Sequence, residues 1–380
     1  MEPPLVINGA YGEGGGQILR TAASLSAITG RPIRIEHIRA NRRNPGMAAQ
    51  HLTSVRAAAA LCQARLSGDV LGSQELDFAP RAPVAAGDYA FDVALAREGG
   101  SAGAVSLVLQ TVLSPLALAP GTSRVTVRGG THLPRSPPVD YLCDVWLPML
   151  RRIGIDADIT LDAWGWFPVG KGQVRATIAG TPEGRRAPQP LNLLERGALR
   201  RVSGRAVAAN LPAHIPQRMA DRAAVLLAQI GAALDIRPEC VHAACPGAGI
   251  FLTADYEHVS AGFNCLGAVG KPSEVVAEEA ATLLLQHHAS GAALDRHLAD
   301  QILVPLGFAQ GTSCYSVEVV STHLQTNAWV VEQFGVASVQ IEQASSGAGR
   351  VTVVPHAARL ATREPFRAMA RINSPLPQQN

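Results

Sequence analysis

The sequence predicts an α/β (α+β) fold in which three repeated units, each a β-sheet with two helices, form one large domain. Three observations support this prediction. An apolar stretch of helical length, a glycine and a β-branched strand recur in this order at three places. A second helix and glycine follow each time. Residues 185–271 interrupt the pattern, which predicts a smaller α/β domain inserted between units two and three.

Each unit begins with a helix that ends at a glycine, because glycine readily adopts the left-handed conformation that closes helices. The β-branched residues that follow favour a strand. The predicted helices are residues 17–29, 106–120 and 300–310, and the predicted strands are residues 32–38, 123–127 and 313–320.

The second helix of each unit also ends at a glycine. These helices are predicted at residues 47–67, 139–153 and 326–334, before Gly68, Gly154 and Gly335. Strands are predicted after the last two, at residues 155–161 and 336–342.

The interruption starts with a polar, proline-bearing connector at residues 180–190. A strand at 202–211, a helix at 216–234 and a strand at 249–255 are predicted after it, and the repeat resumes with a helix at 272–291. The predicted limits are 1–184 for units one and two, 185–271 for the inserted domain, 272–355 for unit three and 356–380 for a C-terminal tail.

The composition predicts a soluble globular protein, with 47% hydrophobic and 17% charged residues among 380. This length exceeds one ordinary core and indicates two or three packing units. The net charge of +3 excludes a strongly basic, non-specific nucleic-acid binder, and the aromatic content of 4% excludes many stacking platforms. Any RNA site is therefore expected at a local patch.

Neither the cysteines nor the apolar stretches indicate an exported or membrane protein. The six cysteines are scattered, and the spacing of Cys240 and Cys245 matches no common zinc pattern. Residues 104–120 contain polar side chains and are shorter than the roughly 20 apolar residues that a membrane span needs. No signal peptide is apparent at residues 1–8. A cytoplasmic location without a membrane partner is expected.

The segment GAYGEGGGQILR, residues 9–20, is the most informative motif. Consecutive glycines before a helix let the backbone approach a ligand and present N–H groups to a phosphate. Glu13 is placed to hold a divalent metal that bridges nucleotide phosphates. Gln17 and Arg20 lie three apart on one helical face. The alternative is an ordinary glycine-rich turn, and the GK[ST] of a Walker loop is absent.

Basic residues gather in IRANRRNPGMAAQH, residues 38–51. One guanidinium group can bind two phosphate oxygens through parallel hydrogen bonds, so this cluster suits phosphate recognition. A solvated basic loop is the alternative. The cluster comprises Arg39, Arg42 and Arg43, and the helix that follows carries Gln50 and His51.

Two further loops precede helices. EGGSAGAVSLVLQT opens the helix that carries Gln110, whose neutral amide suits a nucleotide or a metal-bound water. GGTHLPRSPPVDY places Pro137 and Pro138 where they can present a flat apolar surface to a base. Helix capping and punctuation by proline are the alternatives.

His323 lies after the strand at 313–320 and before the helix at 326–334, at the edge of a sheet where catalytic residues of α/β proteins often lie. Histidine is a reasonable nucleophile toward phosphorus because its ordinary pKa of about 6.5 leaves it partly neutral at pH 7. A structural histidine is the alternative. The neighbouring His287 and His288 are expected on a helix surface.

Seven blocks together resemble the RNA 3′-terminal phosphate cyclase family. They are GAYGEGGGQILR, IRANRRNPG, QHL, GGSAG…LVLQTVL, GGT…PP, HLADQ and STHLQTN, in the family's order, between about Val6 and about Val353. The resemblance implies a nucleotidyl-transferring ligase that converts an RNA 3′-terminal phosphate into a 2′,3′-cyclic phosphate. It implies ATP and Mg²⁺ or Mn²⁺ as cofactors, RNA with a 3′-phosphate end as partner, and three α/β units plus a small inserted domain.

The resemblance also implies roles for individual residues. His323 matches the histidine that attacks the α-phosphate of ATP and carries AMP, and Glu13 matches a glutamate near the metal and the triphosphate. Pro137 matches a proline that packs on adenine. The other implied nucleotide-site residues are Gln110, Arg20, His297, Leu298, Ala299, Asp300 and Gln301. The residues implied at the RNA end or its phosphate are Arg39, Arg42, Gln50, His51 and Gln17.

Two positions depart from the family's pattern: Lys171 in PVGKGQV, and His297, where some relatives have tyrosine. A cyclase-like protein of ribosome assembly is the alternative function, although such relatives lack the nucleophilic histidine. An enolpyruvyl transferase with similar repeated units is a further alternative, and it would form no covalent nucleotide. The RNA substrates, the preferred metal and the oligomeric state stay open.

Overall fold

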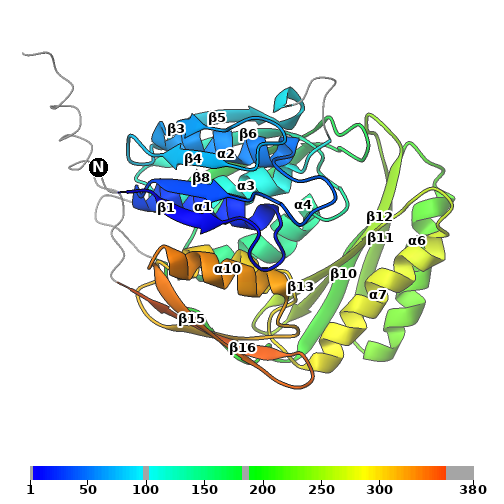
Figure 1. The fold of residues 1–380 in the computed structure, drawn as a ribbon. Coiled ribbons are helices and arrows are strands. Elements are labelled where there is room, and N and C mark those ends of the chain that lie inside the picture. Colours follow the sequence, from blue (N-terminus) through cyan, green and yellow to red (C-terminus); the bar gives the residue numbers. More distant parts are fainter. Residues whose placement is uncertain (1–2, 97–101, 182–187, 357–380) are drawn as a thin grey trace, which may run out of the picture.

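Helices and mixed β-sheets make up the chain (Figure 1). The computed structural model describes residues 3–96, 102–181 and 188–356. Within these ranges there are four sheets of four strands each. The α-helices are α1 Gly16–Thr29, α2 Ala49–Cys62, α3 Val105–Leu118, α4 Val139–Tyr141, α5 Leu147–Arg152, α6 His214–Leu227, α7 Ser273–Ser290, α8 Leu298–Gln301, α9 Leu303–Leu306 and α10 Thr322–Gln333.

Three of the sheets have the same strand order, in which the third and fourth strands along the chain exchange places. Their orders are β1-β2-β4-β3, β5-β6-β8-β7 and β9-β14-β16-β15. In each sheet the first pair is parallel and the other pairs are antiparallel. The strands are β1 Leu5–Asn8, β2 Ile33–Glu36, β3 Arg65–Ser67, β4 Leu76–Ala79, β5 Asp88–Asp92, β6 Thr122–Gly129, β7 Ala157–Ala163, β8 Gly172–Ala179, β9 Asn192–Leu193, β14 Ser313–Val317, β15 Ala337–Gln343 and β16 Gly349–Pro355.

Local signals place most of these elements. Helix α1 ends at Gly30, which has a φ of 73° and donates its N–H to the carbonyl of Ser26. This is the left-handed closure that glycine favours. In β2, buried and half-buried residues alternate, as expected for a strand with one face on the core. The predicted helices at 17–29, 106–120 and 272–291 agree with α1, α3 and α7 within two residues.

Other predicted helices were wrong in extent. The helix predicted to residue 67 ends at Cys62, because Gln63 adopts a left-handed conformation and Leu66 then pairs with Phe78 in the first sheet. The helix predicted at 300–310 is broken into α8 and α9. The helix predicted at 216–234 ends with a 3₁₀ turn at Ile230, after which the chain enters a strand. Apolar periodicity alone does not separate a helix from the strand that follows it.

The fourth sheet has the order β11-β10-β12-β13, and α6 and α7 pack together on it. Its strands are β10 Leu199–Ala209, β11 Ala233–Val241, β12 Gly247–Tyr256 and β13 Ser260–Leu266. Two contacts cross the predicted limits of 185 and 271. Strand β9 pairs with β14 of the third sheet, and α7 packs on the fourth. The predicted tail, apart from His356, lies outside the described residues.

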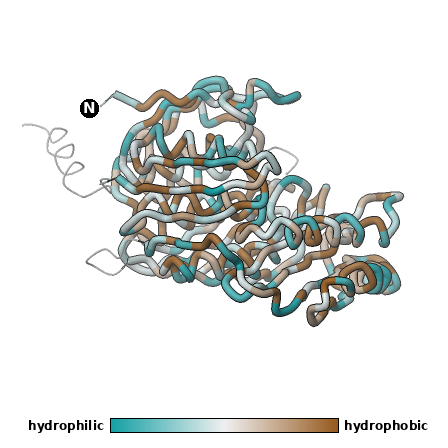
Figure 2. Tube along the Cα trace, turned by 90° about the horizontal axis from the view of Figure 1, so that it is seen from below, coloured by the Kyte–Doolittle hydropathy of each residue, from teal (hydrophilic) through white to brown (hydrophobic). Residues whose placement is uncertain are grey.

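Helix α1 lies at the centre of the large packing unit, where it contacts α2, α3 and α10. Almost every residue of α1 is buried, so the helix is enclosed on all sides rather than amphipathic. Hydrophobic and hydrophilic residues alternate along many of the surrounding strands (Figure 2). The packed face of each sheet is therefore apolar. In the three described ranges, no helix is both long enough and apolar enough to cross a membrane.

The prediction that His287 and His288 lie on the surface was wrong for His287. Its side chain is fully buried, and its Nδ1 lies 2.9 Å from Oε2 of the buried Glu318. His287 lies on the side of α7 that faces the fourth sheet, where its ring contacts Tyr256 of β12 and Phe263 of β13.

Replacing Leu25 of α1 by alanine is expected to lower the free energy of unfolding by about 2–5 kcal/mol, because it leaves a cavity at the centre of the helix cluster. Leu95→Ala is the matched control, since Leu95 is 83% exposed and its loss should cost less than about 0.5 kcal/mol. Urea denaturation followed by circular dichroism measures both. Equal destabilisation by the two variants would contradict the central role of α1.

Candidate active site

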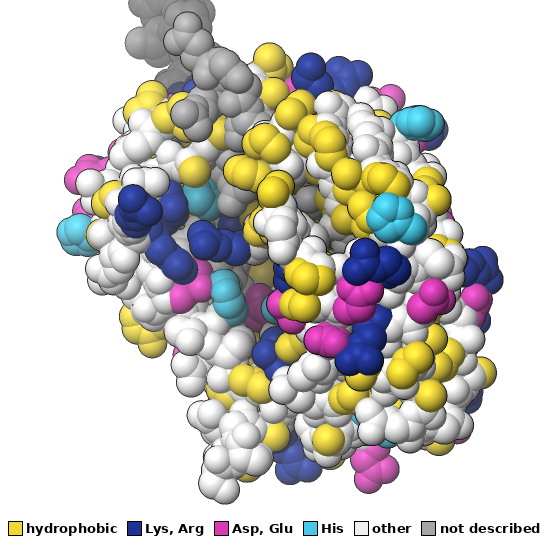
Figure 3. Space-filling model, turned by 90° about the vertical axis from the view of Figure 1, so that its right-hand side faces the viewer, with side chains coloured by type: hydrophobic (Ala, Val, Ile, Leu, Met, Phe, Trp, Pro, Cys, Tyr) yellow, Lys and Arg dark blue, Asp and Glu magenta, His cyan; other side chains and the backbone are white. Residues whose placement is uncertain are grey.

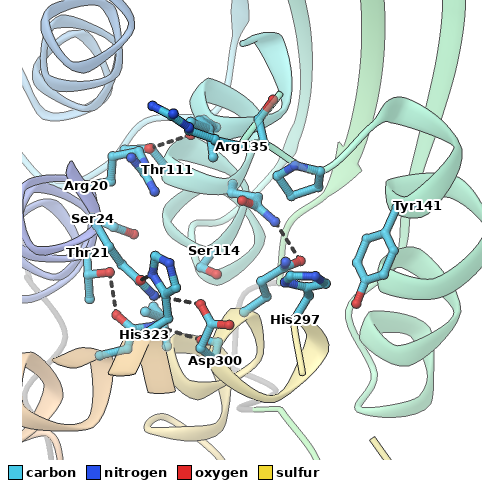
Figure 4. Close-up of a pocket in the computed structure, with 18 of the residues that line it drawn as sticks. Arg20, Thr21, Ser24, Thr111, Ser114, Arg135, Tyr141, His297, Asp300 and His323 are labelled. Atoms are coloured by element: carbon cyan, nitrogen blue, oxygen red, sulfur yellow. Dashed lines mark hydrogen bonds between the residues drawn. The ribbon is translucent and has the colours of Figure 1, made fainter. Parts of the chain in front are cut away.

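A cavity of about 430 Å³ opens between α1, α3 and α10, the loop before α4, and the α8–α9 segment (Figure 4). This volume is within the range of small-molecule sites. In Figure 4, His323, Asp300 and His297 project into it from one side and Arg20 and Arg135 from the other. The lining residues are Gln17, Arg20, Thr21, Ser24, Leu107, Gln110, Thr111, Ser114, Arg135, Ser136, Pro137, Pro138, Tyr141, Asn264, His297, Asp300, Gln301, Val304, His323 and Asn327.

His323 lies on the first turn of α10, three residues earlier than the predicted start of that helix. Ser321 caps the helix by accepting a hydrogen bond of 3.1 Å from the N–H of Leu324. A serine cap fixes where a helix begins. It therefore also fixes the direction in which His323 points from the helix end.

Both ring nitrogens of His323 have partners. Its Nε2 lies 3.0 Å from Oε2 of Glu13, and its Nδ1 is hydrogen-bonded to the side-chain oxygen of Gln17. The amide nitrogen of Gln17 donates in turn to Oδ2 of Asp300 at 2.6 Å. The carbonyl of Gln17 can only accept, so Nδ1 of His323 carries a proton in this arrangement.

The charges of Glu13 and His323 are coupled. The hydrogen bond to Glu13 raises the pKa of His323 above its ordinary value, against the opposing effect of burial. Burial opposes ionisation of Glu13, but the hydrogen bond and charge of His323, with Arg42 and Arg20, lower the pKa of this carboxyl. Nε2 of His323 and the ionised Glu13 therefore form an ion pair.

Burial raises the pKa of Asp300 to about 6, although His323, His297 and Gln17 oppose it. A carboxyl that titrates close to neutral pH inside a cavity is a feature of functional sites. Asp300 is held in place through its backbone, because the side chain of Asn327 donates to its carbonyl at 2.6 Å.

Glycine is required at two positions at the start of α1, because side chains of other residues approach the backbone closely there. A Cβ on Gly15 would lie 1.8 Å from the carboxylate of Glu13, and one on Gly16 would lie 2.0 Å from Nε2 of His51. The glycine motif therefore leaves room for an acid and an imidazole directly above the N-terminus of the helix. Such a terminus favours a bound anion.

A neutral histidine lies among the basic residues. Burial, with the charges of Arg20, Arg39 and Arg42, lowers the pKa of His51 to about 3. Its Nδ1 accepts the N–H of Ala48 at 3.1 Å, so Nε2 carries the proton and faces Gly16. His51 is therefore a neutral hydrogen-bond donor beside the helix start.

The arginines are held differently from one another. Arg42 lies 3.3 Å from Glu13, and Arg39 donates to the carbonyl of Gly46 at 2.6 Å. Burial lowers the pKa of Arg20 to about 10, which leaves it protonated at pH 7. Basic, acidic and histidine side chains are interspersed on the face shown in Figure 3. The arginines beside the cavity therefore form a local group, which agrees with the small net charge of the chain.

The opposite side of the cavity has a different chemistry. Gln110 donates to Oε1 of Gln301 at 2.7 Å, and the ring of His297 meets Tyr141 edge to face with centroids 6.3 Å apart. Pro137 and Pro138 lie above them in the loop before α4. Amides, rings and prolines suit a flat heterocycle better than a phosphate.

The structure brings together eight of the predicted site residues in the cavity wall. These are Gln17, Arg20, Gln110, Pro137, His297, Asp300, Gln301 and His323. Glu13 adjoins them through His323. Gln50 accepts from the N–H of Ala104 at 3.3 Å, outside the wall. Leu298 and Ala299 are fully buried in the core and do not line the cavity.

Sequence reasoning missed several lining residues. Thr21 and Ser24 lie four and seven positions after Gln17, and Thr111 and Ser114 follow Gln110 on an otherwise apolar helix. Polar residues at helical spacing were a signal that could have found them. Asn264 of β13 carried no such signal, because it reaches the cavity from a different sheet.

The donors present fit one kind of metal site. Among residues 3–96, 102–181 and 188–356, no three His, Cys, Asp or Glu side chains are grouped to hold an ion. Mg²⁺ is commonly bound by one or two carboxylates together with substrate phosphates and water. The ionised Glu13 beside the anion-favouring start of α1 fits this mode.

Comparison with known proteins identifies the family. The family profile described as "RNA 3'-terminal phosphate cyclase" matches residues 11–341. The chain belongs to the RNA 3′-terminal phosphate cyclase family. A relative of this name from Methylococcus capsulatus is 59% identical over 92% of this chain and 96% of its own length. One from Trichormus variabilis is 55% identical over 89% and 96%, and one from Methanopyrus kandleri is 41% identical over 92% and 98%.

The cyclase family is a family of enzymes, so the matches place this chain among enzymes rather than among binding modules. The family match spans every segment that lines the cavity, from Gln17 to Asn327. Among solved structures, an enolpyruvyl transferase from Streptomyces tendae has a TM-score of 0.21 at 12% identity over 94% of this chain and 83% of its own. This likeness is too weak to carry an argument.

His51 is expected to stay neutral down to about pH 4 in the folded protein, because its pKa is lowered to about 3. Its ¹⁵N imidazole shifts should show the Nε2–H tautomer, and in urea the same histidine should titrate near 6.5. Folding stability should then fall as pH decreases from about 6.5 toward 3, since the unfolded chain binds this proton more tightly. Titration of His51 near pH 6.5 in the folded protein would contradict the assignment.

Proposed function

We propose that this protein is an ATP-dependent enzyme that converts an RNA 3′-terminal phosphate into a 2′,3′-cyclic phosphate through a histidine-bound AMP. The observation that carries this proposal is His323 in the cavity, with Nδ1 held by Gln17 and Nε2 3.0 Å from Glu13, the carboxylate beside the start of α1. The family membership supports the RNA end as substrate.

In the first step, Nε2 of His323 attacks the α-phosphorus of ATP. An N–P bond forms, the bond from this phosphorus to the bridging oxygen of the β-phosphate breaks, and pyrophosphate leaves. Gln17 keeps the remaining ring proton on Nδ1 by accepting it, so that the lone pair of Nε2 faces the phosphorus. Asp300 orients the amide of Gln17, which fixes the direction of this hydrogen bond.

The Nε2 lone pair becomes available when the partner of Glu13 changes. Glu13 and His323 form an ion pair, in which Nε2 donates its proton to the carboxylate. A divalent metal held by Glu13 and the phosphates would supply charge neutralisation on the triphosphate. His323 reacts as a neutral imidazole after its Nε2 proton has passed to solvent water.

Charged and neutral hydrogen-bond donors both contact the phosphate oxygens in this proposal. Arg20 and Arg42 supply full charges, which stabilise the charge that builds up on the transferring phosphoryl group. His51 supplies a neutral N–H beside Gly16, which adds a donor without further repulsion among the arginines. Arginines gathered at one site can bind a polyanion even though the net charge of the chain is small.

Two further steps complete the reaction. An oxygen of the RNA 3′-phosphate attacks the phosphorus of the histidine-bound AMP, the N–P bond breaks, and an RNA-diphosphate-adenosine forms. The neighbouring 2′-hydroxyl then attacks the RNA phosphorus, loses its proton and displaces AMP. Adenylylation is needed because the oxygens of a terminal phosphate are poor leaving groups.

We also propose that the chain consists of three repeated units and one small inserted domain. The common strand order of three sheets supports three repeated units that build one large domain. The β10–β13 sheet with α6 and α7 supports a small domain inserted within unit three, at about residues 199–290, because β9 before it and β14 after it pair with each other.

His323→Ala is expected to abolish covalent labelling by α-labelled ATP with Mg²⁺ or Mn²⁺, because it removes the attacking nitrogen. The native chain should carry an acid-labile, alkali-stable label after denaturing electrophoresis. His214→Ala, which removes an exposed histidine at the start of α6, is the matched control and should label normally. Absence of label on folded native protein would reject the proposal and leave an RNA-binding or assembly protein as the better account.

Gln17→Met is expected to slow label formation about 10–100-fold, by analogy with the loss of a partner that orients a functional histidine. Methionine keeps the length of the side chain but accepts no strong hydrogen bond from Nδ1. Single-turnover labelling at saturating ATP measures this rate. Gln17→Glu retains an acceptor and should recover part of it, whereas a native rate in Gln17→Met would show that Gln17 does not set the tautomer.

A further inference from the structure

The wall of the cavity that holds Pro137 is tied to the β10–β13 sheet by buried charges. Nε2 of His132 lies 2.6 Å from Oδ2 of Asp140, and these side chains are 0% and 3% exposed. The other carboxylate oxygen of Asp140 accepts two hydrogen bonds from Arg205 of β10, one of them from Nε at 3.0 Å. The loop 132–140 is thus held at both ends.

Aromatic rings enclose this network. The ring of His132 stacks on Trp164 and Trp166, with centroids 4.5 and 5.0 Å apart, and Phe251 of β12 lies at 5.0 Å. The guanidinium of Arg205 lies 5.3 Å from the Trp164 ring. Burial opposes ionisation of Asp140, but His132 and Arg205 lower its pKa to about 2. The carboxylate is charged in a poorly solvated place, where its directional bonds are strong.

A second buried carboxylate, that of Asp295, also links the β10–β13 sheet to the cavity wall. Asp295 accepts the hydroxyl of Tyr141 at 2.8 Å and the N–H of Gly262 of β13 at 3.3 Å. It also accepts the N–H groups of His297 and Leu298, at 2.9 and 3.0 Å, where α8 begins. Asp295 therefore joins the fourth sheet to both segments that line the side of the cavity opposite Arg20.

We infer that the β10–β13 sheet shapes the nucleotide side of the cavity, and that Arg205 is a positioning residue that acts through Asp140 on the loop carrying Pro137. The inference rests on the proposed function for the identity of the ligand as ATP. Residues 133–138 run between anchored ends, and Arg135 among them has a φ of 66°. A non-glycine residue in this conformation persists only where its surroundings hold it.

The energetics favour a role in geometry over one in stability. A buried ion pair gains little net stability over an apolar pair of similar volume, because both charges lose their hydration. Its hydrogen bonds nevertheless permit only one arrangement of the groups they join. Loss of Arg205 should therefore loosen the loop and weaken ATP binding, while His323, Gln17 and Glu13 keep their mutual geometry.

The first experiment measures the Kd of ATP by equilibrium dialysis, with each variant combined with His323→Ala so that ATP is not consumed. Arg205→Ala is expected to raise the Kd about 5–20-fold, the usual range for coupling between separate sites. The rate of labelling at saturating ATP, measured with His323 in place, should stay within about twofold of native. Arg205→Lys retains one charged donor and should give an intermediate Kd.

Arg201→Ala is the matched control. Arg201 lies on the same strand and pairs with Asp255 at 2.6 Å, but it is exposed and touches no residue of the cavity wall. Its loss should leave the Kd of ATP unchanged. An equal rise in Kd for Arg201→Ala would show a general effect of damage to the sheet and overturn the inference.

A double-mutant cycle tests the route. If Arg205 acts through the loop, Arg205→Ala with Pro137→Ala should weaken ATP binding no more than the stronger single change, rather than by the product of the two. Multiplicative effects, or a native Kd in Arg205→Ala, would overturn the inference while leaving the proposed function intact.

Failure of a chain with native Arg205 to bind ATP would reject the proposed function itself. If Arg205→Ala does not fold, a native Kd in Arg205→Lys overturns the inference.

Discussion

The contact between α1 and α10 is the interaction on which the cavity depends. It brings Gln17 within hydrogen-bond distance of His323, and Thr21 within 2.6 Å of Asn327, although each pair is 306 positions apart. Such long-range polar contacts form only after the sheets have packed on both sides of the helices, because they gain little while water still competes for the same groups. Once formed, they fix the position of His323, its tautomer and the carboxylate beside it.

A second constraint is electrostatic. Several cations must lie close together to bind phosphates, yet every buried charge costs solvation. The chain meets this constraint by pairing Arg42 with Glu13 and by keeping His51 neutral. The effect is a local group of arginines in a protein whose net charge is only +3. The same logic explains why the basic loop adjoins a helix start, where the backbone supplies donors that carry no full charge.

The fourth sheet adds a constraint of another kind. Its hydrogen bonds to the cavity wall, from Arg205 and the N–H of Gly262, end on the buried carboxylates of Asp140 and Asp295, whereas its own exposed ion pairs, such as Arg201 with Asp255, are solvated. Buried and exposed polar contacts with similar donor–acceptor distances therefore affect the structure differently. The exposed ones contribute little beyond solubility. The buried ones limit how the two parts of the molecule can meet.

The sequence by itself determined the α/β class and the main helices such as α1 and α7, because glycine closures and apolar periodicity are local properties. Its short motifs also predicted the residues that we propose to act around His323. It did not determine where the helix after Met47 ends, since a left-handed Gln63 and a strand pairing with Phe78 decide that. It also left open which polar residues share the cavity. Asn264 and Tyr141 belong to segments far apart in the chain, and only packing brings them to one cavity and places Arg205 on Asp140 behind its wall. The tertiary structure decided their roles because hydrogen bonds between such segments depend on the relative placement of whole sheets, which no local pattern encodes.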